Sequence, residues 1–559
     1  MADQTNNSPQ LSGLALLQNR LKNKGTAFTN EERDQFNLHG HLPPKVETLD
    51  QQAARCYADL TKEGMSNLDK YRTLADIQDE NETLFFKVLL DHLEEFAPIV
   101  YTPTIGKVCQ EYSKIYKRPR GLWLNPIHKG KIESILASLN RDIKLIVVTD
   151  NQRILGLGDL GAGGIGIPIG KINLYTAGAG IAPENVLPIS LDVGCNVDTV
   201  KNSDHYFGVD SARLSGQEYD DFLEEFVQAV FKLWPNVLLQ WEDFWKNNAI
   251  DILEKYRHKY LSFNDDIQGT ASVGVGGVLA AYKMLGKDLS KAKIVMLGGG
   301  AAGTGIMNLL EMALKEAGNP NPKDNLMVLD SKGLITLSRK GGYGGDSFKA
   351  QFAKSSEEVA KIFGQDKVEQ NIYLEELVDI FKPDVLFGTS GVPNTFTEQA
   401  IKNMAKHCER PIIMPFSNPT SQCEAIPQDI INWTNDQAVI ATGSPFQPVT
   451  RSDGSKQRIG QGNNVFVFPG IGLGTIFAKA SKIPDSILYA AAVALSENVA
   501  ADDFAEGSCY PKISELREVT VQVAKKVAER CELEGVNQVE LKHDTLAEDI
   551  RAAMWVPEY

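Results

Sequence analysis

The sequence predicts an α/β protein with two series of alternating strands and helices, a helical N-terminal domain and a short helical C-terminal extension. Three observations support this fold class. Apolar residues recur at three- and four-residue spacing near both ends of the chain, as on amphipathic helices. Between the ends, short apolar runs closed by Gly, Asp or Asn alternate with helical patterns, as in buried parallel sheets. A chain of 559 residues is also long enough for several domains of roughly 150 residues each.

The predicted elements follow one another in two series. Helical spacing dominates from about residue 50 to 118, and the second series begins near Asp266. Helices are predicted at Thr73 to Ile77, Thr83 to Leu93, Val108 to Tyr116, Tyr219 to Trp234, Ile267 to Leu285, Val519 to Ala528 and Leu546 to Trp555. Strands are predicted at Lys144 to Val148, Ile154 to Leu157, Lys293 to Leu297, Leu326 to Leu329, Val385 to Phe387 and Ile412 to Met414.

Net charge and the N-terminus narrow the classes of partner. The formal charge of -15 and the pI of about 5.2 oppose nucleic acid or anionic lipid as a main partner, because the mean field repels phosphate. The polar start, Met1 to Gln10, resembles neither a secretory signal nor a transit peptide. No apolar run reaches about 18 residues, so no membrane span is predicted. We expect a cytoplasmic protein.

Cysteine and histidine usage indicates which atoms would hold a metal. The seven cysteines are scattered and never in Cys-x-x-Cys spacing, which favours reduced thiols over disulfides or a thiolate zinc site. They are Cys56, Cys109, Cys195, Cys408, Cys423, Cys509 and Cys531. The eight histidines form no His-x-x-x-His pair. A metal would therefore be held by oxygen atoms.

The glycine pattern after residue 297 predicts a Rossmann-like dinucleotide-binding domain. Strand Lys293 to Leu297 runs into Gly298-x-Gly300-x-x-Gly303, and a helix follows through Ala313. Such glycines permit a tight turn and a close approach of the backbone, and the helix N-terminus stabilises pyrophosphate. Alone, the pattern also fits a surface turn. The flanking strand and helix, and Asp330 closing the next strand, favour the dinucleotide interpretation.

Asp330 favours NAD over NADP. Its carboxylate suits a ribose hydroxyl and would repel a 2′-phosphate. It lies 30 positions after Gly300 (330 − 300), beyond the usual spacing of about 20, and we attribute the excess to the polar insertion Gly318 to Asp324. Ser331, Lys332 and Arg339 could each bind a 2′-phosphate, so NADP stays an alternative.

Three further glycine-containing segments are candidate crevice loops. Gly388 to Gly391 and Gly443 to Pro445 follow apolar strands and could line the crevice, or be plain strand-ending turns. Gly156 to Gly166 precedes no clean βαβ unit. We interpret it as backbone shaped around a substrate or the cofactor phosphates, not as a second dinucleotide site.

Two pairs of adjacent acids predict a hard-cation site. Glu242-Asp243 and Asp265-Asp266 each end an apolar stretch, and neighbouring buried acids repel one another unless a cation or protons neutralise them. A single such acid is often a helix cap. Two pairs in one domain are better explained by Mg²⁺ or Mn²⁺.

Three other side chains are candidates with ordinary alternatives. Lys171, in an apolar glycine-rich segment, is a base only if desolvation or a nearby cation lowers its pKa, and is otherwise a paired lysine. Tyr101 would alone be a packed aromatic. Arg153 is a candidate carboxylate clamp or one half of a surface salt bridge.

Taken together, several ordered motifs resemble the malic enzymes, most closely the bacterial NAD-linked branch. The resemblance runs from about Gly25 to the C-terminus. Its motifs are Tyr101-Thr-Pro-Thr, Arg153-Ile-Leu-Gly-Leu-Gly-Asp-Leu-Gly, Gly166-Ile-Pro-Ile-Gly-Lys171, Trp241-Glu-Asp-Phe, Phe263-Asn-Asp-Asp-Ile-Gln-Gly-Thr, Ser417-Asn-Pro-Thr and Gly462-Asn-Asn464.

The resemblance implies oxidative decarboxylation of L-malate to pyruvate and CO₂ with reduction of NAD and oxaloacetate as intermediate. Glu242, Asp243 and Asp266 would ligate the metal. Lys171, with Asp265 beside it, would take the hydroxyl proton, and Tyr101 would protonate enolpyruvate. Arg153, Asn418 and Asn464 would hold the substrate. The expected cofactor contacts are Arg153, Gly298, Gly300, Ala301, Ala302, Gly303, Asp330 and Asn418.

The resemblance also implies a domain order and a homo-oligomer, dimer or tetramer. We expect a helical domain at 1–118, a substrate-side α/β domain in two segments at 119–264 and 464–530, the dinucleotide-binding domain between them at 265–463, and a C-terminal extension at 531–559. Malolactic enzyme, which releases lactate, is the nearest alternative. Such enzymes typically replace the residues at Thr102 and Arg153, and both are present here. A catalytically silent binding protein would be expected to lack Lys171 or a metal ligand.

Overall fold

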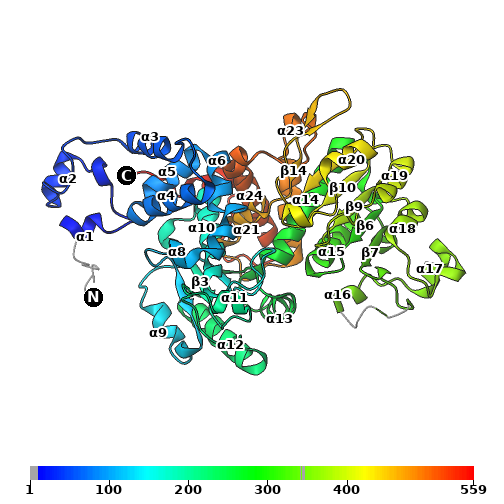
Figure 1. Ribbon diagram of the computed structural model, residues 1–559, viewed down its shortest axis with the longest axis horizontal. Coiled ribbons are helices and arrows are strands. Elements are labelled where there is room, and N and C mark those ends of the chain that lie inside the picture. Colours follow the sequence, from blue (N-terminus) through cyan, green and yellow to red (C-terminus); the bar gives the residue numbers. More distant parts are fainter. Residues whose placement is uncertain (1–10, 340–341, 343–346) are drawn as a thin grey trace.

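A group of helices forms the N-terminal region, as predicted (blue in Figure 1). The computed structural model describes residues 11–339, 342 and 347–559, so Met1 to Gln10 lie outside the described residues. Side chains of Thr48, Ser66 and Asn81 accept hydrogen bonds from the first turns of three of these helices and fix where they begin. The helices are α3 (Leu49–Leu60), α4 (Asn67–Glu80), α5 (Glu82–Asp91), α6 (Leu93–Val100), α7 (Thr104–Gln110) and α8 (Tyr112–Ile115).

The first sheet has five parallel strands in the order β1-β3-β2-β4-β5. Alternate residues of its central strand enter different cores: Ile146 and Val148 pack with α12, whereas Leu145 and Val147 pack with α10. Both faces are therefore covered, as a parallel sheet requires. The elements are β1 (Leu122–Leu124), α9 (Ile132–Ala137), β2 (Leu145–Thr149), α10 (Gly166–Ala179), β3 (Val186–Leu191), α12 (Gly216–Leu233), β4 (Leu238–Trp241), α13 (Lys246–Tyr256) and β5 (Ser262–Asn264).

The second sheet has seven strands in the order β14-β11-β10-β9-β6-β7-β8. Its strands are parallel except β8, which pairs antiparallel with β7. The chain runs outward from β6 through β7 and returns to β9 on the other side, which is the Rossmann arrangement. The strands are β6 (Ile294–Leu297), β7 (Leu326–Asp330), β8 (Gly333–Leu334), β9 (Val385–Gly388), β10 (Ile412–Pro415), β11 (Val439–Thr442) and β14 (Gly460–Gln461).

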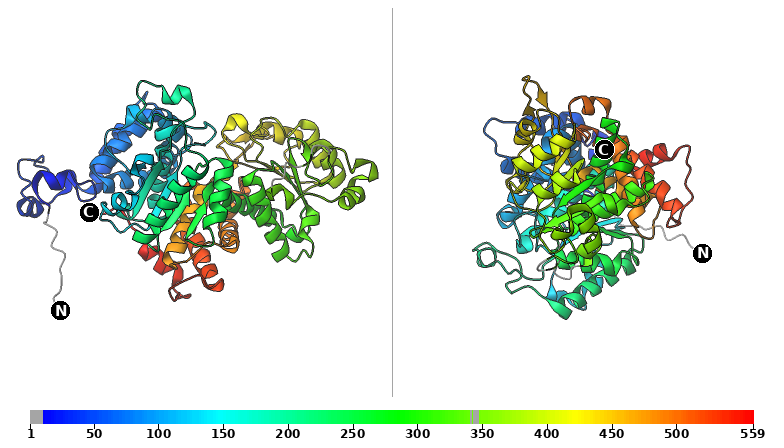
Figure 2. Two further views of the ribbon diagram at one scale, coloured as in Figure 1. Left: turned by 90° about the horizontal axis from the view of Figure 1, so that it is seen from below. Right: turned by 90° about the vertical axis from the view of Figure 1, so that its right-hand side faces the viewer.

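Helices on both faces complete this second lobe, and a small hairpin extends from it. The helices are α14 (Thr270–Leu285), α15 (Ala301–Glu316), α16 (Ser347–Ala350), α17 (Ser356–Phe363), α18 (Leu374–Phe381), α19 (Glu398–His407) and α20 (Pro427–Trp433), and the hairpin strands are β12 (Val449–Thr450) and β13 (Lys456–Gln457). The two sheets therefore lie in two lobes side by side (Figure 1, Figure 2). The predicted α/β fold class is confirmed.

The C-terminal helices join the lobes. Helix α21 (Phe468–Phe477) packs against α10 of the first lobe, and α22 (Asp485–Glu497) packs against α14 of the second. Helix α24 (Leu516–Leu533) packs on both α21 and α22, and α25 (Leu546–Ala553) follows it. The chain end then returns to the N-terminal helices, where the Tyr559 hydroxyl donates to Gln52 Oε1 at 2.7 Å. One hydrophobic core thus runs through both lobes.

One predicted strand is wrong. Ile154 to Leu157 forms a tight turn, closed by the Ile154 N–H donating to Gly158 O at 2.9 Å, and Leu155 has a positive φ of 50°. An apolar run between glycines has the composition of a short strand, but β2 has already ended at Thr149, and this run turns back on itself with Ile154 buried and Leu157 exposed. The other predicted strands and helices are present with ends shifted by a few residues, except that the predicted helix Val108 to Tyr116 is divided between α7 and α8.

Within the described ranges, no helix has the length and apolar character needed to cross a membrane.

Candidate active site

Each sheet has a switch point, where the chain turns to opposite sides of one strand, and several of the predicted site residues lie at these points. In the first sheet β2 leads to β3 on one side, and β4 lies on the other. Arg153 follows β2, and Glu242 and Asp243 follow β4. In the second sheet the glycine turn after β6 lies beside the end of β9. Ligands of parallel sheets bind at such crevices.

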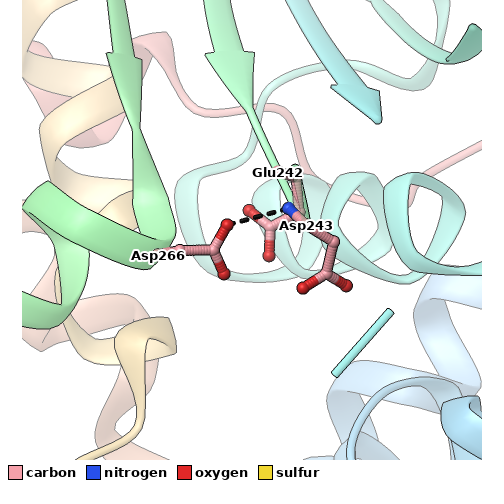
Figure 3. A group of neighbouring side chains, drawn as sticks. All are labelled: Glu242, Asp243 and Asp266. Carbon is pink, nitrogen blue, oxygen red and sulfur yellow. Dashed lines mark hydrogen bonds between the residues drawn. The ribbon is translucent and has the colours of Figure 1, made fainter. Parts of the chain in front are cut away.

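Three carboxylates from two neighbouring strand ends converge (Figure 3). Glu242 and Asp243 come from the end of β4, and Asp266 comes from the turn after β5. One oxygen of each lies within 4.8 Å of the others. Glu242 and Asp243 are buried, and Asp266 is partly buried. The three candidate metal ligands are thus brought together.

Backbone hydrogen bonds hold the acids in place. The Asp243 N–H donates to Asp266 Oδ2 at 2.8 Å, so the two strand ends are tied directly (Figure 3). Asp243 has a positive φ of 56°, which a short Asp side chain tolerates better than most. The Leu155 N–H donates to Asp243 Oδ2 at 3.2 Å, and the Arg153 N–H donates to Asp243 O at 3.1 Å. The turn after β2 is therefore part of the same structure.

The electrostatics of this group call for a cation. Burial raises the pKa of Glu242, Asp243 and Asp266, and neighbouring carboxylates raise it further. Lys171 forms ion pairs with Glu242 and Asp265, while Asp243 and Asp266 lie beside Glu242, so negative charge is in excess. Carboxylate oxygens are the ligands that Mg²⁺ and Mn²⁺ prefer. The residues present fit a hard divalent cation.

Lys171 lies in the buried helix α10 and reaches both acid pairs. It is 2% exposed, and its Nζ forms ion pairs with Asp265 and, at 3.1 Å, with Glu242 Oε1. Burial alone would lower its pKa, but the charges of Asp265 and Glu242 outweigh burial and raise it. The lysine is therefore protonated while these acids are uncompensated.

Asp265 is completely buried and connects the two lobes. It begins a short π-helix, Asp265–Gly269, a geometry often found at functional sites. The Asn464 amide donates to Asp265 Oδ2 at 2.9 Å, whereas Oδ1 has no hydrogen-bond partner. A Cβ at Gly269 would lie 1.8 Å from that Oδ1, so only glycine leaves room for it. This oxygen therefore lies against the Gly269 backbone without a hydrogen-bond donor from the described residues.

Tyr101 lies beside Lys171, at the junction of the helical region and the first lobe. Lys171 Nζ is 5.4 Å from the centre of its ring, and burial raises the pKa of its hydroxyl well above the ordinary value. The phenol therefore stays protonated and able to donate.

The candidate substrate clamps lie on facing loops. Arg153 is exposed and close enough to lower the pKa of Asp243 and Asp266. Asn418 follows β10 and accepts a hydrogen bond from Ser444. A Cβ at Gly156 would lie 2.8 Å from Pro419, so the loops after β2 and β10 touch across the lobes.

The glycine turn has the geometry that its pattern predicts. Gly298 has a φ of 133°, and a Cβ at Gly303 would lie 2.0 Å from Gly298 O. A Cβ at Gly300 would meet nothing within 4 Å, so this side of the turn is open. Ala301 and Ala302 begin α15. The first and third glycines serve backbone conformation and packing, and the second faces free space.

Asp330 ends β7 but is already paired within the chain. Arg339 donates to both of its oxygens, at 2.8 and 2.6 Å, and Lys349 Nζ donates at 2.7 Å. Burial would raise its pKa, and these hydrogen bonds outweigh that effect and lower it. Arg339 is 3% exposed, so it is not a free surface cation. The insertion before β7 forms a turn and a 3-10 helix, Pro322–Asn325, which explains the long spacing.

The glycine-rich run from Gly156 to Gly166 shapes the protein's own packing. A Cβ at Gly161 would lie 2.2 Å from the Tyr206 hydroxyl, and one at Gly164 would lie 2.6 Å from Asn151 Oδ1. The run then enters α10, in which every residue is buried. It positions Lys171 by close packing, and Gly156 alone faces the opposite lobe.

Sequence reasoning missed Gln240, a buried residue that holds a candidate ligand. Its Nε2 donates to Glu242 Oε2 at 2.8 Å, and its Oε1 accepts from the Tyr175 hydroxyl. Because side chains two apart on a strand share a face, an amide two positions before Glu242 was a usable signal. Tyr175 lies 65 positions from Gln240 in the sequence, and no sequence pattern pointed to it.

Two family models match most of the chain. Residues 78–257 match the model described as "Malic enzyme, N-terminal domain", and residues 267–532 match "Malic enzyme, NAD binding domain". The first match covers the first sheet except its last strand, and the second covers the second sheet and the joining helices.

Known proteins match over nearly the whole length. The NAD-dependent malic enzyme of Aeromonas hydrophila is 44% identical over 551 residues, 98% of this chain and 96% of that protein. That of Pseudomonas aeruginosa is 42% identical over the same shares. Among solved structures, malic enzyme from Pyrococcus horikoshii aligns with a TM-score of 0.55 at 25% identity, covering 82% of this chain and 88% of that one. Entamoeba histolytica malic enzyme aligns at 0.54 and 22% identity, covering 93% and 91%.

Proposed function

The chain belongs to the malic enzyme family, and from that premise we propose which of its residues carry out the NAD-dependent oxidative decarboxylation of malate to pyruvate. One observation carries the proposal: three convergent acids, a buried lysine and a buried aspartate with an unpartnered oxygen meet at the switch point of the first sheet, against the crevice of the second.

The metal ligands are Glu242, Asp243 and Asp266, holding one Mg²⁺ or Mn²⁺. When bound, the ion supplies Lewis-acid polarisation of the substrate's hydroxyl and carboxylate oxygens. Gln240 orients Glu242, and the Asp243 N–H orients Asp266.

Lys171 is the base for the C2 hydroxyl of L-malate, with Asp265 as its partner. Oxidation at C2 needs a group that accepts the hydroxyl proton while hydride leaves for the nicotinamide. Lys171 Nζ is fixed between Asp265 and Glu242, so its proton can pass to Asp265 before it accepts another. The Asn464 amide keeps Asp265 in place.

Tyr101 is the acid that protonates C3 once CO₂ has left. Its hydroxyl is protonated because burial raises its pKa, and its ring lies against Lys171. The proton that Lys171 gains is therefore close to the site from which Tyr101 loses one, which lets the pair exchange protons between the two halves of the reaction.

Arg153, Asn418 and Asn464 bind the substrate carboxylates. They approach from the end of β2, the end of β10 and the segment before α21, so all three are brought together only when the two lobes meet. A guanidinium matches a carboxylate through two parallel hydrogen bonds.

The dinucleotide binds along the crevice of the second sheet. Gly298, Gly300, Gly303, Ala301 and Ala302 form the turn and helix start that suit its pyrophosphate. Asp330 meets the adenosine ribose, and Arg153 and Asn418 meet the nicotinamide end. NADP is the second candidate, because Arg339 and Lys349 place two cations around Asp330.

The assay that tests the reaction uses purified protein, L-malate and Mn²⁺, with NAD and NADP in separate reactions. We expect pyruvate in step with NADH. Lactate without net NADH would mean malolactic chemistry, and faster NADPH formation would move the cofactor preference to the cations around Asp330. No turnover of malate with either cofactor would refute the proposal.

We also propose that the protein is a homo-oligomer, dimer or tetramer, and that its chain divides at 118, 264, 463 and 530. Light scattering behind size-exclusion chromatography separates two or four copies of the 61.4 kDa chain from a monomer. Limited proteolysis at these boundaries tests the division.

A further inference from the structure

Glu424 is a buried acid that the reaction above does not use. It follows β10 by nine positions (424 − 415), and its exposed fraction is 0%. The hydrogen-bond donors to its side chain are serine groups. A buried carboxylate without a cation persists only where hydrogen bonds replace its hydration.

Four donors from two loops supply those hydrogen bonds. Glu424 Oε1 accepts from the Ser390 N–H at 2.7 Å, the Ser390 hydroxyl at 2.9 Å and the Ser417 hydroxyl at 2.5 Å. Glu424 Oε2 accepts from the Ser417 N–H at 3.3 Å. The Ser417 hydroxyl also accepts from the Gly391 N–H at 2.8 Å. The carboxylate therefore ties the loop after β9 to the loop after β10.

Both loops contact residues assigned to the cofactor and substrate. Thr389, next to Ser390, lies against the glycine turn: a Cβ at Gly298 would be 2.5 Å from its Oγ1. Asn418, next to Ser417, accepts from Ser444 on a third loop. The Glu424 carboxylate therefore supports the loop beside the pyrophosphate-binding turn, and it also supports the loop that carries the proposed substrate ligand Asn418.

We propose that Glu424 is a positioning residue for the dinucleotide crevice, which fixes the Thr389–Gly391 and Ser417–Pro419 loops in the spacing that NAD and malate require. The proposal rests on the proposed function, since it concerns the same crevice. Glu424 touches neither substrate nor cofactor and acts through Ser390 and Ser417.

Glu424→Gln tests the proposal at nearly constant size. The amide keeps one acceptor, but its NH₂ group faces serine donors and leaves buried donors unpaired. We expect the dissociation constant of NADH, followed by its fluorescence without malate or metal, to rise about tenfold. The KM for NAD should rise in parallel, and Mn²⁺ affinity should stay at the wild-type value because the ligands lie in the other lobe.

Glu358→Gln is the matched control. Glu358 caps α17 in the same lobe and accepts a hydrogen bond from the Ser355 N–H, so its loss should cost stability without changing NADH binding. Should Glu424→Gln fail to fold, Ser390→Ala removes only one donor and is expected to weaken NADH binding about threefold.

Each outcome decides a separate claim. Wild-type NADH affinity in folded Glu424→Gln, or in Ser390→Ala where the former does not fold, overturns the positioning role. An equal loss in Glu358→Gln also overturns it, because the effect would then be general to the lobe. If wild-type protein binds NADH but does not turn over malate, the proposed reaction fails while the binding comparison still stands.

Discussion

The acid site of the first sheet and the nucleotide crevice of the second sheet treat charge in opposite ways. Glu242, Asp243 and Asp266 repel one another, and Lys171 forms its ion pairs with Glu242 and Asp265. Asp330, in contrast, is paired with Arg339 and Lys349 and carries less charge than its cations. The first region therefore needs a cation from solution, whereas in the second the chain itself supplies the positive charge. The charge of the acid site therefore depends on a bound ion, whereas the charge around Asp330 depends on the chain's own residues and can be changed by substitution.

Lys171→Ala should have the largest effect, because it removes the cation that forms ion pairs with Glu242 and Asp265 and also removes the proposed base. We expect kcat to fall by about 10²- to 10⁴-fold, the usual contribution of a general base. The NADH dissociation constant should change little, which separates chemistry from cofactor binding. Steady-state kinetics with L-malate and Mn²⁺ measures the first, and fluorescence titration the second.

Lys354→Ala controls for the loss of a buried lysine. Lys354 is 4% exposed, donates to Lys323 O and lies in the second lobe, away from the acids. A comparable fall in kcat in this variant would mean that lost folding, not lost chemistry, explains both.

Gln240→Leu tests how far the acid site depends on the residues behind it. Gln240 donates to Glu242 Oε2, and a leucine of similar size cannot. We expect Mn²⁺ affinity, measured by calorimetry, to fall about 10- to 100-fold, as for other residues that orient metal ligands. Tyr175→Phe, which loses only the hydroxyl that donates to Gln240, should give a smaller change. Unchanged affinity in Gln240→Leu would show that the three acids hold the ion unaided.

Local patterns predicted much of this arrangement from the sequence. The glycine turn, Asp330 at a strand end and the two acid pairs each lie within a few residues of a strand with a clear apolar run. Helix α10 gave no helical period because all its faces are buried, so Lys171 appeared only as part of a glycine-rich segment. The pairing of Asp330 with Arg339, and of Glu424 with two serines, depends on side-chain direction in the folded crevice, which no spacing encodes.

Asp330→Asn tests the charge arrangement in the nucleotide crevice of the second sheet. Removing the carboxylate leaves Arg339 and Lys349 without their shared anion and removes the charge that repels a 2′-phosphate. We expect the ratio of kcat/KM for NADP to that for NAD to rise by about tenfold, because the repulsion between the Asp330 carboxylate and the 2′-phosphate is lost. Asp366→Asn, which removes an exposed acid of the same lobe, should leave the ratio unchanged. A constant ratio in both variants would mean that Asp330 does not face the ribose.

The same substitution should have its smallest effect on stability, and the size of that effect depends on pH. Hydrogen bonds from Arg339 and Lys349 outweigh burial and hold the pKa of Asp330 below its ordinary 3.8, so the charged form is favoured in the folded protein. That contribution is complete above pH 3.8 and is lost as the pH falls toward the lower folded value. The urea midpoints of wild type and Asp330→Asn should therefore differ by the same amount at pH 7 and 5, and the difference should begin to narrow at pH 3. A gap that stays constant over this range would assign the loss to packing around Arg339, and the two regions would then differ in geometry and not in the origin of their counter-charge.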